Sequence, residues 1–88
     1  MAVSSEGRDI QACVDQWCQH DTRYRGCTIL IRDYRIYLED VVIWRTDDSM
    51  VDVAQYGRRL PSFIALVTDI AAIELSGVDK DWLTIRMA

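Results

Sequence analysis

Three cysteines and one histidine form the residue set that could hold a zinc ion: Cys13, Cys18, His20 and Cys27. Structural zinc sites usually pair their ligands about two to four residues apart, because the chain must bend around the ion. Cys13 and Cys18 are five residues apart, and on a helix this spacing separates them by about 140° around the axis. Cysteines on the apolar side of a helix are usually packing residues. We therefore expect buried thiols, with no metal and no cofactor.

Catalysis near neutral pH would need a base, and His20 is the only histidine. A Cys–His pair also needs a thiol within hydrogen-bond reach and a third group that orients the ring. We instead interpret His20 as a surface residue at the C-terminal end of a helix, where the helix dipole favours its cation. The acidic pairs Glu39-Asp40, Asp47-Asp48 and Asp79 with Asp81 are interpreted as turn residues. Since no phosphate loop or nucleophile elbow accompanies them, the sequence leans against an enzyme.

Arginine and tyrosine are interleaved in residues 23–25 and 32–37. Arginine can bind phosphate or carboxylate through two parallel hydrogen bonds, and tyrosine can stack on a planar ligand. Nearby acids offset these cations, and both residue types are also enriched at protein interfaces. We therefore rank a protein partner first, a small anionic ligand second and nucleic acid third. The candidate contact residues are Arg32, Tyr34, Arg35, Tyr37 and Trp44.

An amphipathic helix from about residue 5 to 20 is the first element expected to position side chains. Ser4 or Ser5 is its candidate N-cap, because a hydroxyl can accept from an unpaired amide of the first turn. Apolar residues then recur at intervals of three and four, which places them on one helix face. This stripe consists of Ile10, Cys13, Val14, Trp17 and Cys18.

The middle of the chain favours strands. Residues 27–31, 34–38 and 41–46 are rich in β-branched and aromatic side chains, and Arg32-Asp33 would join the first two as a hairpin. Glu39-Asp40 is either a tight turn or a bulge inside one long strand. After a turn at 47–49, residues 50–57 form either a strand or a helix. We favour the strand, because a short hairpin closes the connection simply.

The last third of the chain predicts a second helix and a final strand. Pro61 suits the first turn of a helix and Gly77 suits its C-terminal cap. Between them, an apolar stripe is formed by Phe63, Leu66, Val67, Ile70, Ile73 and Leu75. Residues 82–87 have strand character. The order α-β-β-β-(β)-α-β over residues 1–88 predicts a single α+β domain, with a mainly antiparallel sheet of four to five strands and two helices.

Composition indicates the compartment. The chain has 88 residues, a formal net charge of −4 and three cysteines, and an odd number of cysteines does not suit a disulfide-stapled secreted domain. We expect no signal peptide, because no apolar run follows a cationic start. The apolar stretch at 63–75 is too short and too polar to span a bilayer. We therefore expect a cytoplasmic protein without a membrane partner, and the acidic balance argues against a general nucleic-acid binder.

The predicted central strand is apolar on both faces, with Val41 and Ile43 opposite Val42 and Trp44. A sheet with one wet face should alternate apolar and polar residues, and two helices on one side would leave the other uncovered. We therefore expect a non-enzymatic interaction module, a homodimer anchored by Trp44 and Tyr37.

Two alternatives stay open. One is a small-molecule binder or small enzyme with a pocket between sheet and helix, and with Arg35, Tyr37 or Trp44 on its wall. The other is an acidic inhibitor or decoy, of the kind that phages and mobile elements carry, which would occupy a nucleic-acid-binding surface on another protein.

Overall fold

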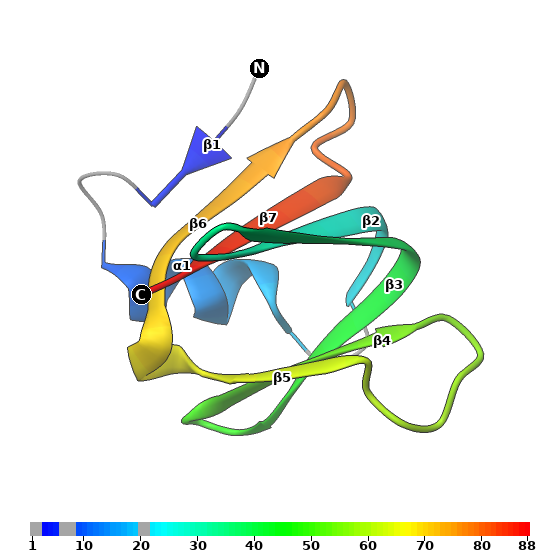
Figure 1. Ribbon diagram of the computed structural model, residues 1–88, viewed down its shortest axis with the longest axis horizontal. Coiled ribbons are helices and arrows are strands. Elements are labelled where there is room, and N and C mark those ends of the chain that lie inside the picture. Colours follow the sequence, from blue (N-terminus) through cyan, green and yellow to red (C-terminus); the bar gives the residue numbers. More distant parts are fainter. Residues whose placement is uncertain (1–2, 6–8, 20–21) are drawn as a thin grey trace.

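In the computed structural model, seven strands form one mixed sheet that curls around one α-helix (Figure 1). The structure describes residues 3–5, 9–19 and 22–88, and these counts refer to them. The elements are β1 (Val3–Ser4), α1 (Ile10–Trp17), β2 (Thr22–Ile31), β3 (Tyr34–Asp47), β4 (Met50–Gln55), β5 (Phe63–Leu66), the 3-10 helix η1 (Val67–Asp69), β6 (Ile70–Ser76) and β7 (Trp82–Met87). The strand order across the sheet is β1-β6-β7-β2-β3-β4-β5. All neighbouring strands are antiparallel except β2 and β7, which are parallel.

The predicted α+β fold with two helices and four to five strands is wrong. The described chain is mostly β, and the predicted second helix is replaced by β5, η1 and β6. In β5 and η1 the burial alternates as in a strand, with Ala65 and Val67 buried and Ile64 and Leu66 exposed. Two-residue periodicity is the signature of a strand.

A bulge in β6 explains why the sequence resembles a helix. The register between β6 and β7 shifts between Ile70 and Ala72. Ile70 and Ile73 are therefore both buried although they are three residues apart. Gly77 has φ +93°, the left-handed conformation expected of a cap, but it lies in the turn after β6, where its carbonyl accepts from the Lys80 amide at 3.2 Å.

Helix α1 is shorter than predicted and begins after a different cap. The Asp9 carboxylate accepts from the backbone N–H of Gln11 at 3.0 Å. Ser4 belongs to β1, and the Ser5 hydroxyl accepts from the Ile73 amide at 2.9 Å. The apolar stripe itself is confirmed, because its members in and beside α1 are buried, apart from the partly buried Ile10: Cys13, Val14, Trp17 and Cys18.

The predicted strands form largely as expected. β2 and β3 pair as a hairpin with Arg32 and Asp33 between them. Residues 50–55 form a strand, which confirms the favoured alternative, and the last strand has the predicted bounds 82–87.

Glu39-Asp40 lies inside one continuous strand and is not a turn. The register with β2 is the same on both sides of the pair. However, Asp40 has φ +52°, a left-handed conformation that aspartate tolerates better than most residues. Leu38 and Val41 consequently both pack against the core although they are three residues apart. β3 bends along its length (Figure 1) and so joins the two halves of the sheet.

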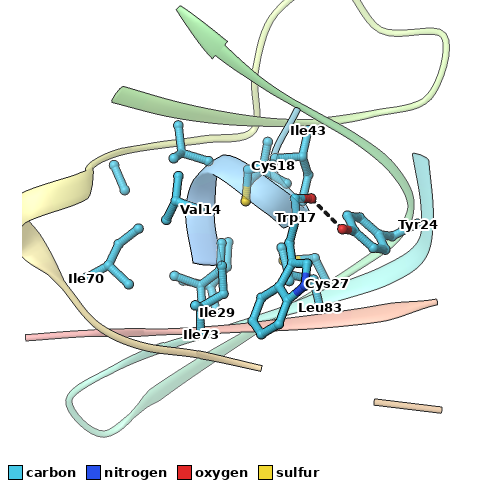
Figure 2. Close-up of a cluster of buried hydrophobic side chains, with 14 of the residues drawn as sticks. Val14, Trp17, Cys18, Tyr24, Cys27, Ile29, Ile43, Ile70, Ile73 and Leu83 are labelled. Atoms are coloured by element: carbon cyan, nitrogen blue, oxygen red, sulfur yellow. Dashed lines mark hydrogen bonds between the residues drawn. The ribbon is translucent and has the colours of Figure 1, made fainter. Parts of the chain in front are cut away.

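The core lies between α1 and the concave side of the sheet. Figure 2 shows Val14, Trp17 and Cys18 of α1 and its C-terminal end surrounded by strand residues that include Ile29, Ile43, Ile73 and Leu83. The Tyr24 hydroxyl donates to the carbonyl of Trp17, the dashed line in Figure 2. This bond satisfies a polar group that would otherwise be costly to bury.

The three cysteines are buried free thiols. Burial raises the pKa of Cys18 and of Cys27 to about 12, so both are neutral at physiological pH. Within the described ranges no group of side chains could hold a metal ion, and His20 and Asp21 lie outside these ranges. The same ranges contain no helix with the length and apolar character that a membrane crossing requires.

Candidate protein-interaction face

Four of the five predicted contact residues lie at the β2–β3 hairpin. Arg32 is in its turn, and Tyr34, Arg35 and Tyr37 follow on β3. All four are exposed, Tyr34 to 74% and Tyr37 to 61%. Arginine and tyrosine are thus accessible here, as expected.

Trp44 lies in another part of the molecule, beyond the bend at Asp40. It pairs with Asp52 of β4, whereas Tyr37 pairs with Thr28 of β2. The structure therefore does not bring Trp44 and Tyr37 together, because the bend and their spacing place them on different halves of the sheet. A shared anchor of these two residues is replaced by a surface built around Trp44.

That surface is the outer side of the C-terminal half of β3 together with β4 and β5. The inner side is fixed by Val41 and Ile43 of β3 and by Val51 and Val53 of β4, all 0% exposed in the core. Successive side chains of a strand point to opposite sides, so the residues between them point away from α1. We call this surface the β3–β5 face; it comprises Val42, Trp44, Asp52, Ala54, Tyr56, Ile64 and Leu66.

The β3–β5 face is largely apolar and partly open. Ile64 is 49% exposed and Leu66 is 44% exposed, while Trp44 is half-buried. A hollow of about 290 Å³ lies beside them, lined mainly by Val42, Trp44, Ala54, Tyr56 and Arg58. Apolar side chains gathered around a hollow are the usual composition of a contact surface.

Asp52 is the exceptional residue of this face. It is only 7% exposed, and its cross-strand neighbours are the apolar Trp44 and Ile64. Its Oδ1 atom is buried and has no hydrogen-bond partner among the described residues. A buried acceptor without a donor carries a desolvation cost that a hydrogen bond would remove.

Arg23 closes one end of the face and already has its partners. Its guanidinium donates to both carboxylate oxygens of Asp40, at 2.9 and 3.1 Å, and lies 3.8 Å from the centroid of the Tyr56 ring. The hydrogen bond to Asp40 raises the pKa of Arg23. This arrangement holds Tyr56 beside the hollow and leaves Arg23 occupied.

Arg58 differs from Arg23 in having no side-chain partner. It follows Gly57 in the β4–β5 loop, is exposed and lines the hollow. Its guanidinium makes no ion pair or hydrogen bond within the part of the chain that the structure describes. The face thus has a carboxylate oxygen without a donor and, at its rim, a cation without an acceptor.

Comparison of the chain with protein-family models, with curated proteins and with solved structures found no match. The functional argument therefore rests on this geometry.

A larger hollow, of about 690 Å³, lies at the other end of the sheet beside β1, β6 and β7. Its lining includes Leu30, Ala72, Glu74, Thr84 and Arg86. None of the residues predicted for a pocket wall lines it; of these, only Trp44 lines a hollow, the smaller one.

The acidic pairs have structural partners. Asp47 accepts from the backbone N–H and hydroxyl of Ser49, at 2.7 and 2.5 Å, which lowers the pKa of Asp47. Asp81 accepts from Arg25 at 3.1 Å, as Asp40 does from Arg23. These contacts fix turns and strand ends, as predicted for turn aspartates.

Sequence reasoning did not single out Asp52, Ile64 or Arg58. Asp52 follows the alternation of a half-exposed strand, in which an acid normally faces water. Ile64 was assigned to a helix that does not form. The available signal was Trp44, since an apolar residue on the outer side of β3 requires cross-strand neighbours that share its environment.

Proposed function

We propose that the protein is a non-enzymatic interaction module that forms a homodimer through the β3–β5 face. The observation that carries the proposal is the buried Oδ1 of Asp52, which has no donor in the described chain and lies within an apolar surface. An unpaired carboxylate oxygen in such surroundings is destabilising in the isolated chain. A partner that supplies a donor and covers the apolar side chains removes both costs.

The supply of secondary structure supports an external partner for this face. The one α-helix of the described chain packs against the inner side of the sheet. No other described helix is left to cover Trp44, Ile64 and Leu66. Covering them stabilises by about 25 cal/mol for each Å² of apolar surface removed from water.

A second copy is the occupant that the charges favour. The unpartnered carboxylate oxygen of Asp52 and the unpartnered guanidinium of Arg58 lie on the same face or its rim. In a two-fold dimer the same patch meets itself, so each copy can supply what the other lacks. The neutral buried thiols of Cys18 and Cys27 suit the reducing cytoplasm, which we propose as the compartment.

The proposal is tested by size-exclusion chromatography of two arginine variants. Trp44→Arg places a charge at the centre of the face and should shift the protein to the elution volume of a monomer. Tyr37→Arg is the matched control, because it places the same charge on the other half of the sheet, and it should elute as the unaltered protein does. Equal effects of both substitutions, or no effect of Trp44→Arg, would contradict the proposed face.

A further inference from the structure

The hollow of the β3–β5 face lies between the two unpartnered groups. Trp44 and Ala54 line it, and Asp52 adjoins both, across the β3–β4 pair from Trp44 and two residues from Ala54. Arg58 stands on its rim, beyond Gly57. Asp52 and Arg58 are each three residues from Gln55, which also lines the hollow.

A two-fold axis through this hollow would exchange the two positions. It would carry Arg58 of a second copy toward the site of Asp52, and Asp52 of that copy toward Arg58. Residue i then meets residue j twice, as every isologous interface requires. Within one chain the two side chains do not contact each other, so each stays available for the other copy.

On the basis of the proposed homodimer, we infer that Arg58 of each copy binds Asp52 of the other across a two-fold axis at the hollow. The guanidinium carries several donors in a planar fork that matches a carboxylate. Its donor meets Oδ1, the atom without a partner. The Trp44 ring beside Asp52 offers a face on which the guanidinium can stack.

This arrangement assigns different roles to neighbouring arginines. Arg58 lines the hollow, whereas Arg59 is exposed and does not. Both carry the same charge, so a general attraction between copies would depend equally on either. A specific contact to Asp52 depends on Arg58 alone.

Sedimentation equilibrium of charge variants tests the contact. Arg58→Glu brings a carboxylate against Asp52 and should raise the dimer Kd by about tenfold or more, because removing one partner of a desolvated charge pair also leaves the other unpaired. Arg59→Glu, the matched control, should change the Kd by no more than about threefold, as expected of a rim charge.

The sign of the Asp52→Asn effect gives the sharpest discrimination. In the otherwise unaltered protein Asp52→Asn should raise the Kd, because a charged acceptor is lost. In the Arg58→Glu background the same substitution should lower the Kd, because it removes a repulsion. Such a reversal is the mark of two groups in direct contact.

The failures are distinguishable. If the unaltered protein stays a monomer, the proposed function fails together with this inference. If it dimerises through Trp44 but Arg58→Glu and Arg59→Glu act equally, or Asp52→Asn has the same sign in both backgrounds, the dimer stands and the Asp52–Arg58 contact is wrong.

Discussion

The inner and outer sides of β3 and β4 use the same two strands but are completed differently. On the inner side Val41, Ile43, Val51 and Val53 are fully buried against other parts of the same chain. On the outer side Trp44 is only half-buried, and Asp52 keeps a buried oxygen without a donor. The strand thus separates a surface that the chain completes by itself from one that it leaves incomplete. Unsatisfied polar groups on a strand therefore show which side awaits a partner.

The largest expected effect comes from opening the inner side. Trp17 of α1 is buried among strand residues, so Trp17→Ala should leave a cavity and lower the free energy of unfolding by about 3–5 kcal/mol. Chemical denaturation followed by circular dichroism measures the change. An unaltered midpoint would mean that α1 does not complete the inner side.

Alkaline pH should loosen the inner side next. Burial raises the pKa of the Cys18 and Cys27 thiols from 9.0 to about 12, so the unfolded chain loses these protons first. Their contribution is complete below pH 9 and declines toward pH 12, by about 1.4 kcal/mol per pH unit for each thiol. Urea midpoints measured from pH 8 to pH 11 show this slope.

The control for the alkaline prediction is a Cys27→Ala variant. Its cavity lowers stability at every pH, but the decline above pH 9 should be shallower because one titrating group is gone. An identical slope in both proteins would mean that Cys27 does not titrate between the folded and unfolded states.

On the outer side, removing the charge of Asp52 should stabilise the isolated chain. Asp52→Leu replaces a buried carboxylate that has no donor, and we expect a gain of about 1 kcal/mol. Thermal or chemical denaturation is compared at a protein concentration where both proteins are monomers. A loss of more than about 1 kcal/mol in place of a gain would show that the single chain already satisfies Asp52.

The smallest effect on stability is expected at Ile64. Its side chain is 49% exposed on the β3–β5 face, so Ile64→Ser should change the unfolding free energy of the monomer by no more than about 0.5 kcal/mol. Association should weaken nevertheless, because the apolar contact is lost. If monomer stability falls as much as in Trp17→Ala, the two sides of the sheet do not differ as described.

Local patterns predicted the inner side better than the outer side. The spacing of Val14, Trp17 and Cys18 identified the buried face of α1, because a regular helix repeats its contacts. The strands around Arg32-Asp33 were equally clear from residue type and turn chemistry. These features depend on neighbours in sequence and therefore leave a local signature.

The errors arose where tertiary structure overrides the local period. The bulge near Ile70 and the left-handed Asp40 each shift the inward-facing register, and a shifted strand imitates the spacing of a helix. Asp52 was missed for a related reason. Whether an acid on a strand faces water or an apolar neighbour depends on which strands flank β4, and β5 was not predicted as a strand.

Light scattering from the unaltered protein tests the central claim most directly. If the β3–β5 face joins two copies, the molar mass at micromolar concentration should be about 20 kDa, twice the 10.2 kDa of the chain, and should fall toward one chain on dilution. A constant mass of one chain, in protein that stays soluble at millimolar concentration, would contradict the account.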